Sequence, residues 1–375
     1  SGPALKLLRE RGVGVVLVGM GTIDAMEPKG QLHLGMKEKL LHTKDPRYSP
    51  AWIWGMSQMR GLTAATAEPA FFQPDKVVST GGSKRGIATA AAGIHDNRFT
   101  GIVPVVAPPL GNPGTPAAII GTEPSWINGV DAAFLNSVDP GVRKSLEDRR
   151  DRREDTRLTL SEVNQQRWKP AEVKELSQIL WNASRITAYL DEVNRRGLEY
   201  FYCVGTNDSV TPALLQLGRK YPDFPVYIVP GGQHGGPRDA GFTRHVTDEP
   251  GVVQNFESFC LHHFFGLRGL PDTPQISAEM KDGYLVVRTL YEGSSPLKEN
   301  LLSWSYDRHA PYCLPFEYDK WESTEMQAED HNTYSARIPL PAKVLSIQFL
   351  STHVDWENGI PFFVSSPLSE RKVFP

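Results

Sequence analysis

The sequence has little of what defines several large classes of protein. Its 375 residues include only three cysteines, Cys203, Cys260 and Cys313, whose odd number and wide spacing exclude a disulfide framework and a cysteine-based zinc site. Cys203 lies in an apolar run, where a buried thiol is expected. No apolar run reaches the roughly 18 residues of a membrane-spanning helix. The net charge of -3 is neither strongly basic nor strongly acidic, and nothing in it indicates a nucleic-acid partner. We expect no metal, no cofactor, no nucleic-acid partner and no membrane span.

The composition that remains is typical of a globular protein with more than one domain. Hydrophobic residues make up 40% of a chain that is longer than one ordinary core. In residues 1–268, short Val/Ile runs alternate with helical stretches, as in a parallel sheet with crossover helices. In residues 269–375 the pattern changes to short alternating strands, with a hairpin turn at Lys281-Asp282-Gly283. We predict a doubly wound α/β domain followed by a small β-sandwich.

An apolar strand that stops at a serine between glycines is the most informative feature of the α/β region. It reads Val77-Val78-Ser79-Thr80-Gly81-Gly82-Ser83-Lys84-Arg85-Gly86, and a helical stretch follows. A sharp strand-to-helix turn strains the serine and needs very small neighbours, as in the nucleophile elbow of α/β-hydrolases. Here Gly86 comes three residues after Ser83, and Arg85 occupies the usual place of the small residue. The alternative is a helix N-terminus that cradles a phosphate, although the G-x-x-x-x-G-K-[ST] pattern is absent.

The residues that follow stand in the order that an α/β-hydrolase triad requires: serine, acid, histidine. The apolar strand 198–204 leads to a loop with Asp208, and the strand 224–230 leads to a glycine-rich loop with His234. Both loops follow the carboxyl ends of strands, where a parallel sheet gathers its catalytic groups. A helix-capping Asp208 and a surface His234 are the alternatives. The joint order favours a triad of Ser83, Asp208 and His234.

The same region resembles a known family. Val78 to Gly86, then His95-Asp96-Asn97-Arg98-Phe99 and Ile102-Val103-Pro104-Val105, are similar to the PhoPQ-activated pathogenicity-related proteins, and residues 70–265 carry most of the likeness. Ile87 stands where that family usually has tryptophan, and the insertion after the next strand is this chain's own. The resemblance implies an exported protein, periplasmic or secreted, with an α/β-hydrolase fold, a catalytic triad and a poorly defined substrate.

A basic residue directly after the serine gives a more distant resemblance, to glucuronoyl esterases. In those enzymes that residue helps to hold the oxyanion, and Lys84 occupies its place here. The backbone N–H of Lys84 is also a candidate oxyanion donor in any α/β-hydrolase. A solvent-facing lysine in the first helical turn is the alternative. Gly82, Lys84 and Arg85 are the candidate oxyanion and substrate residues, and the sequence does not decide which basic side chain faces a substrate.

The stretch before the elbow is short for a complete α/β-hydrolase. We expect one strand over residues 13–19 and one helix over residues 49–67, whereas the full fold places several strands ahead of the serine. The loop after the third of those strands supplies the second oxyanion donor. Either Gly19-Met20-Gly21 is that loop, or the donor comes from a separate chain or a removed N-terminal segment. We favour the second interpretation.

Residues 108–195 form an insertion between strands, and we expect it to make a lid over the mouth of the active site. It contains Trp126, Trp168 and Trp181, for which a place in the pocket and a place in a core are both open. The mixed-charge run at residues 149–155 is typical of a solvated helix face.

These features together predict a serine hydrolase that cleaves an ester or amide of a small-molecule or polymer-attached substrate. Ser83 forms an acyl-enzyme, His234 transfers the proton and Asp208 orients the imidazole. The alternative is a non-catalytic exported or scaffold protein that keeps the hydrolase fold and uses the C-terminal sandwich for recognition. In hydrolases such a sandwich presents polymeric substrate, braces the catalytic domain or mediates assembly, and the sequence does not choose among these roles.

Overall fold

The computed structural model describes residues 3–19, 39, 42–110, 182–208, 211, 213–234, 244–293, 300–308 and 320–373. The chain divides into two compact units, residues 1–200 and 201–375, and each is described by itself. Most of the expected lid, with its tryptophans and its charged run, lies outside the described residues, as do Met20, Gly21 and Cys313. The domain boundary expected at residues 268/269 stays a prediction.

Short parallel strands form the sheet of the first unit. β1 (Val78–Gly82) pairs with β2 (Gly101–Val105), and β2 also pairs with β3 (Glu199–Tyr200). Every residue of β2 is buried, as is typical of a parallel strand covered on both faces. The single strand expected over residues 198–204 is interrupted at Phe201, which belongs to neither β3 nor the strand that follows it.

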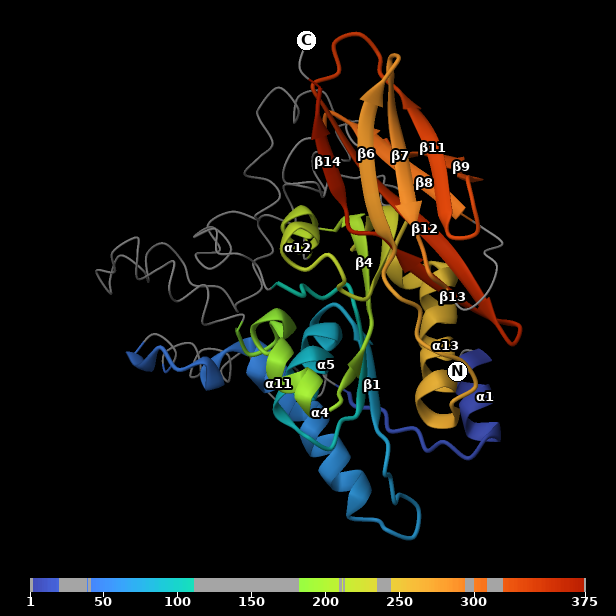
Figure 1. Ribbon diagram of the computed structural model, residues 1–375. Helices are drawn as coiled ribbons and strands as arrows, with labels where there is room; N and C mark the ends of the chain where they lie inside the picture. Colours follow the sequence, from blue (N-terminus) through green and yellow to red (C-terminus); the bar gives the residue numbers. More distant parts are fainter. Residues whose placement is uncertain are drawn as a thin grey trace, which may run out of the picture. The chain divides into compact units, whose positions relative to one another are not determined.

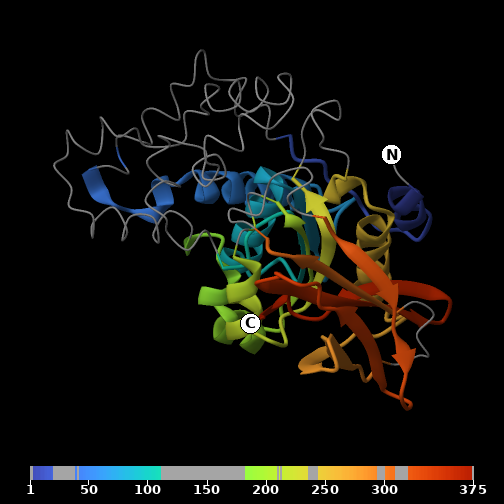
Figure 2. The same ribbon diagram turned by 90° about the horizontal axis from the view of Figure 1, so that it is seen from above.

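Two closely packed helices accompany this sheet (Figures 1 and 2). α4 (Pro50–Thr66) begins after Ser49, whose hydroxyl caps the first turn by accepting a backbone N–H at 3.3 Å. α5 (Lys84–His95) is rich in alanine, largely buried, and packs on β1 and β2. The helices approach so closely that a Cβ on Gly55 would lie 2.7 Å from the Cβ of Ala91. This packing fixes the start of α5 and therefore the residue before it.

Residues 13–19 do not form the buried strand that we expected. They follow α1 (Pro3–Glu10) as irregular chain, with Leu17 80% exposed. The segment belongs to no sheet of the described residues, and a strand needs a neighbouring backbone for its N–H and C=O groups. Val18 instead lies against α4, where a Cβ on Gly61 would come 2.6 Å from its side chain. Packing on a helix thus replaces pairing in a sheet.

The second unit begins with a parallel pair of strands and two helices. β4 (Tyr202–Asn207) pairs with β5 (Val226–Gln233), and α12 (Leu214–Lys220) lies between them in the chain. α13 (Pro250–Phe265) follows and stops at Gly266, whose φ of 62° is the left-handed conformation that ends many helices. A parallel sheet with helices is therefore confirmed.

Two of the cysteines lie in the interior of this unit. Cys203 in β4 and Cys260 in α13 are free thiols, and burial raises the pKa of each to about 12. A thiol in such surroundings stays protonated and unreactive. The buried thiol predicted for Cys203 is confirmed.

Antiparallel strands make up the rest of the second unit. One sheet has the order β10 (Gln327–Ala328), β11 (Thr333–Pro339), β7 (Tyr284–Leu290) and β6 (Gln275–Lys281). The other has the order β13 (Ile360–Ser365), β12 (Ser346–Glu357), β8 (Asn300–Tyr306) and β9 (Glu322–Glu325), and β14 (Ser369–Lys372) also pairs with β12. The predicted hairpin turn is present, because Asp282 and Gly283 have the positive φ values, 51° and 78°, of a tight two-residue turn.

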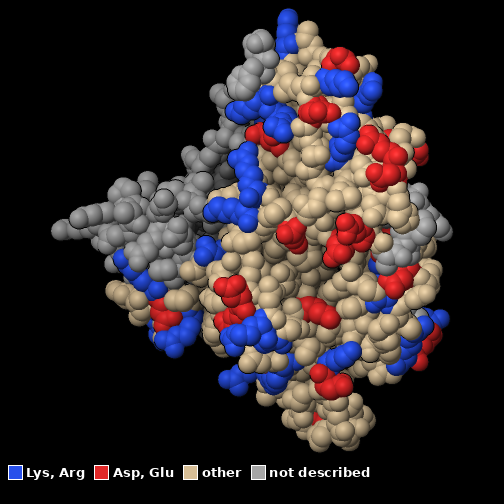
Figure 3. All heavy atoms as spheres, viewed as in Figure 1, with Lys and Arg blue, Asp and Glu red and all other residues tan. Residues whose placement is uncertain are grey.

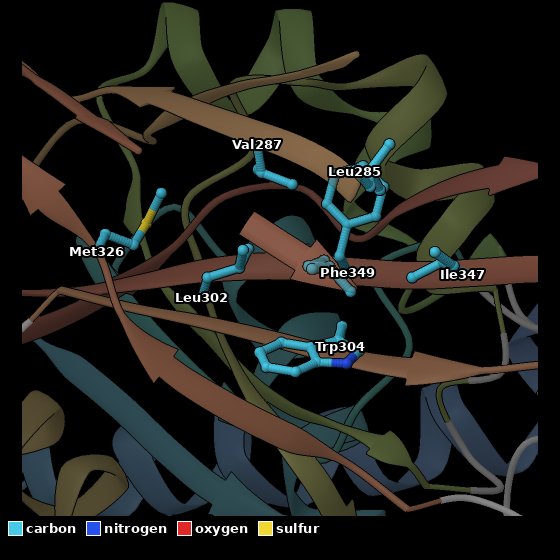
Figure 4. Packing of buried hydrophobic residues seen from close by; sticks show 8 residues of the cluster. Leu285, Val287, Leu302, Trp304, Met326, Ile347 and Phe349 are labelled. Atoms are coloured by element: carbon cyan, nitrogen blue, oxygen red, sulfur yellow. The ribbon is translucent and has the colours of Figure 1, made fainter. Parts of the chain in front are cut away.

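Side chains from both antiparallel sheets share one apolar core (Figure 4). It consists of Leu285, Val287, Leu302, Trp304, Met326, Ile338, Ile347 and Phe349. The change from a parallel to an antiparallel architecture that the sequence predicts is therefore observed, and the two antiparallel sheets pack as a sandwich does.

Buried polar contacts fasten the antiparallel sheets to the α/β part of the same unit. Asn255 of α13 makes two hydrogen bonds of 2.7 Å with the backbone of Phe363 in β13. The buried Arg268 binds the Asp355 carboxylate at 2.7 Å and the Ile360 carbonyl at 2.8 Å. Removing one partner of a buried ion pair typically costs about 3–5 kcal/mol, because the other charge is left unpaired.

Charged side chains of both signs lie on the face of the molecule shown in Figure 3. Within the described ranges, no helix has the length and apolar character needed to cross a membrane. Nor does any cluster of three or more His, Cys, Asp or Glu side chains in this part of the chain have the arrangement of a metal site.

Candidate active site

Ser83 stands at the sharp turn between β1 and α5. Its backbone has φ 59° and ψ -126°, a conformation that residues other than glycine rarely adopt. The Ser83 N–H donates to the Val105 carbonyl at 3.0 Å, and the Ser83 carbonyl accepts from the Ile87 N–H at 2.9 Å. Its side chain makes no capping bond to α5, although serine is a favoured N-cap residue. The predicted strain is present, and the hydroxyl does not serve to cap the helix.

Two glycines provide the space for this turn. A Cβ on Gly86 would lie 2.5 Å from the Val105 carbonyl oxygen and 2.9 Å from that of Gly81. A Cβ on Gly81 would lie 2.6 Å from the Cβ of Arg85. The departure from the usual spacing therefore has a steric explanation. Because residue 81 is glycine, there is room for the Cβ of Arg85 at the position where the motif usually has a small residue. The close approach to backbone oxygens occurs one residue later, at Gly86, and it is there that glycine is required.

A buried polar network holds the first turn of α5 on α4. The side chain of Gln58 accepts a hydrogen bond from the Ser79 hydroxyl at 2.5 Å. It also donates to the Thr89 hydroxyl at 3.1 Å and to the Arg85 carbonyl at 3.3 Å. Gln58 thus connects the strand before the serine with the helix after it. This residue could not be found from the sequence, because it lies far from the motif and carries no signature of its own.

The residues beside Ser83 lie in different surroundings. The Lys84 ammonium is 5.8 Å from the centre of the Trp54 ring, which is a cation–π distance. Arg85 is exposed, and Gly82 is the last residue of β1. The N–H of Lys84 belongs to the first turn of α5. The Lys84 side chain thus has a packing partner, and its backbone remains the oxyanion candidate.

Asp208 and His234, which follow β4 and β5, form a hydrogen-bonded pair. Oδ1 of Asp208 lies 2.9 Å from Nδ1 of His234. The Asp208 side chain is fully buried, whereas 26% of the His234 side chain is exposed. The capping role considered for Asp208 does not hold, because Ala213 is the residue that precedes α12 and the helix has no side-chain cap. The carboxylate instead binds an imidazole that stays partly exposed.

Glycines bring these two strand ends together. The register between β4 and β5 shifts between Gly205 and Asn207, where β5 contains an irregular stretch. Gly231 in that stretch has φ 69°, and a Cβ on Gly205 would lie 2.2 Å from the Gly232 carbonyl oxygen. Backbones approach this closely only where neither carries a side chain. The glycine-rich loop expected before His234 is therefore in part a strand with a bulge, which re-aims the side chain that follows it.

Two further side chains contact the end of β4, the acid-bearing strand that directly precedes Asp208, and could not be found from the sequence. Arg308 and Trp321 both donate hydrogen bonds to Asn207 Oδ1, at 3.2 Å each. They lie far along the chain, in the region of antiparallel strands, and neither belongs to a recognisable motif. A single arginine or tryptophan without a motif gives no signal that links it to a distant site.

The three residues proposed as a triad fall in different units. Ser83 belongs to the first, and the Asp208–His234 pair belongs to the second. The structure brings Asp208 and His234 together, and the assignment of all three residues to one catalytic triad stays a prediction.

A comparison with protein families concerns the part that contains the serine. Residues 47–112 match the family model of the PhoPQ-activated pathogenicity-related protein. The match confirms the resemblance seen in the sequence. It includes α4, β1, Ser83, α5 and β2, so the whole elbow lies within the PhoPQ-related segment. Asp208 and His234 lie beyond the matched residues. A comparison with curated proteins gave no match.

Proposed function

We propose that this protein is a serine hydrolase with an α/β-hydrolase fold. The Ser83 oxygen bonds to the carbonyl carbon of an ester or amide while His234 Nε2 takes the hydroxyl proton. The leaving alcohol or amine departs with that proton, and an acyl-enzyme remains. Water then attacks the acyl group in the same way, which releases the acid and restores the serine. Asp208 holds the Nδ1–H of the imidazole throughout.

The backbone conformation of Ser83 is the single observation that carries this proposal. A non-glycine residue in such a region costs about 1–3 kcal/mol and persists where the surrounding structure enforces it. Gly81, Gly86 and the Gln58 network provide that enforcement. A phosphate site at a helix N-terminus uses backbone N–H groups and does not require a strained serine. The geometry of the turn therefore favours a nucleophile.

The Asp208–His234 pair supports the same chemistry. A buried carboxylate bonded to Nδ1 favours the tautomer with its proton on that atom, which leaves Nε2 as the base. The proposal requires that Nε2 comes within hydrogen-bond reach of the Ser83 hydroxyl. The Lys84 N–H is proposed as an oxyanion donor. Gly82 and Arg85 flank the reacting serine and are the candidates for further substrate contacts.

A fluorophosphonate probe tests the proposal, because it reacts covalently with an activated serine. We expect mass spectrometry to map the label to Ser83, and Ser83→Ala to lose both labelling and hydrolysis of p-nitrophenyl esters. Ser351 is the matched control, since its hydroxyl lies 3.0 Å from a ring nitrogen of His353 while both residues are 0% exposed. Ser351→Ala should label like the parent.

Two results would contradict the proposal. Labelling that persists in Ser83→Ala would show that a different residue is the nucleophile. A protein that neither labels nor hydrolyses any ester, yet binds a protein partner, would favour the non-catalytic scaffold.

A further inference from the structure

Oxygens from two regions of the second unit converge on the guanidinium group of Arg308, which follows β8. Arg308 donates to the Thr206 carbonyl at 2.8 Å, to Asn207 Oδ1 at 3.2 Å and to Gln348 Oε1 at 2.7 Å. It is only 8% exposed, and Gln348, in β12, is 1% exposed. Thr206 and Asn207 directly precede Asp208. An arginine from the antiparallel region therefore holds the end of the strand that carries the acid.

Trp321 contacts the same strand end and also the one that carries the histidine. Its ring centre lies 5.0 Å from the Arg308 guanidinium carbon, and its Nε1–H donates to Asn207 Oδ1 at 3.2 Å. Its ring also lies beside the bulge of β5, because a Cβ on Gly231 would lie 3.6 Å from the ring atom Cδ1. Gly231 donates its N–H to the Thr206 hydroxyl at 2.7 Å, which ties the two strand ends together.

We propose that Arg308 and Trp321 form a clamp that positions the Asp208 carboxylate and the His234 imidazole. The inference rests on the proposed function, since this positioning matters for catalysis only if the pair acts on a substrate. The planar guanidinium presents its donors in a rigid fork, so it holds a backbone carbonyl and a side-chain oxygen at the same time. Because it is nearly buried, Arg308 is a positioning residue rather than a catalytic one. Three roles were considered for the antiparallel region: presenting substrate, bracing the catalytic domain and mediating assembly. The proposed clamp corresponds to the second, bracing.

Two variants of Arg308 test whether the planar set of N–H donors or the positive charge is responsible for the positioning. Arg308→Met removes the donors and keeps an apolar stem, whereas Arg308→Lys keeps the charge without the fork. In the full-length protein we expect Arg308→Met to lower kcat for a p-nitrophenyl ester about 10- to 100-fold with little change in KM, because small misplacements of catalytic groups have effects of this size. Arg308→Lys should recover part of the loss. Trp321→Phe, which removes only the indole N–H, is the milder variant if Arg308→Met does not fold, and a smaller decrease is expected.

A second measurement does not depend on hydrolysis. The imidazole N–H proton of His234 can be followed by NMR and assigned by its loss in His234→Gln. Its hydrogen bond to Asp208 slows exchange with water, so a loosened pair should shift or broaden the signal in Arg308→Met. Arg268→Met is the matched control, because Arg268 is also buried in this unit but binds Asp355 instead of the acid-bearing strand. That control should unfold more easily and still keep the His234 signal and the kcat of the folded protein.

The two measurements distinguish failure of the clamp from failure of the hydrolase proposal. Unchanged kcat and an unchanged His234 signal in Arg308→Met would overturn the clamp, as would equal losses in Arg268→Met. If the parent protein hydrolyses no ester but the signal changes in Arg308→Met alone, the positioning role stands and the hydrolase function fails.

Discussion

His234 and His353 have similar hydrogen-bond partners in opposite environments. On Nδ1, His234 has a carboxylate oxygen of Asp208 at 2.9 Å, and His353 has the amide oxygen of Asn300 at 2.8 Å. His353 also has the Ser351 hydroxyl 3.0 Å from Nε2, so a serine, a histidine and an amide stand in line. Judged by its distances alone, the Ser351–His353–Asn300 network resembles a catalytic triad.

Burial separates the two histidines. His353 is 0% exposed, Tyr291 stacks on its ring at 5.1 Å, and desolvation lowers its pKa to about 3. His234, in contrast, keeps 26% of its side chain exposed. An imidazole held neutral inside a core cannot exchange protons with a substrate. Access, and not hydrogen-bond geometry alone, therefore distinguishes a candidate catalytic histidine from a structural one.

The largest effect that tests this comparison is expected from Asp208→Asn. An amide beside Nδ1 favours the wrong tautomer, and we expect kcat to fall about 10⁴-fold with the fold intact. Steady-state hydrolysis and thermal unfolding measure the two effects. The mirror change, Asn300→Asp, gives the buried network its carboxylate and should create no activity in a Ser83→Ala background. Hydrolysis by that double variant would show that a buried histidine can also act as the base, which would contradict the role assigned to access.

The next effect concerns stability in acid. His353 has a folded pKa of about 3, so between about pH 3 and the unfolded value of about 6.5 the unfolded chain binds a proton that the folded chain does not. From this residue the free energy of unfolding should fall by about 1.4 kcal/mol for each pH unit from about pH 6.5 down to about pH 3, and the contribution should be complete above about pH 6.5. Urea titrations near pH 7 and pH 5 measure the difference. His353→Gln should reduce it, and equal differences in the parent and His353→Gln would contradict the assignment.

A smaller effect is expected at the backbone crossing that supports His234. Gly205→Ala would place a Cβ 2.2 Å from a carbonyl oxygen, and we expect a loss of about 1–3 kcal/mol in the free energy of unfolding together with reduced hydrolysis. Gly269→Ala is the control, since a Cβ there meets only a Glu357 oxygen, at 3.6 Å. Chemical denaturation of both variants measures the difference. Similar losses at the two sites would show that the close approach is not what matters.

The smallest effect is expected from Lys84→Met. Loss of the cation–π contact with Trp54 should lower the free energy of unfolding by about 0.5–1 kcal/mol. Because the backbone N–H is retained, fluorophosphonate labelling should continue at a similar rate. A variant that folds but no longer labels would assign the lysine side chain, and not only its backbone, to the accessible site.

Features that depend on neighbours in the chain could be predicted from the sequence. Gly81 and Gly86 indicated the strained turn, and Asp282-Gly283 indicated the hairpin, because each requires particular residues within a few positions. The strand expected over residues 13–19 was wrong, since a β-branched run says nothing about which backbone lies beside it.

The support of the candidate site could not be predicted in the same way. Gln58 braces the elbow from an earlier helix, and Arg308 and Trp321 reach the acid-bearing strand from the antiparallel region. Each contact joins segments that are far apart in sequence, and the residue type alone does not specify its partner. The hydrophobic pattern of a strand indicates that its faces will be buried, but it does not identify which side chains from other segments will pack against them.

The buried thiols of Cys203 and Cys260 can report when the interior of the second unit becomes exposed to solvent. A thiol with a pKa of about 12 gives almost no thiolate near neutral pH, so a pulse of alkylating dye should mark these two positions only in molecules whose interior has come apart. With Cys313 replaced by serine, the rate of dye uptake would time the unfolding of the second unit under native conditions, without heat or denaturant.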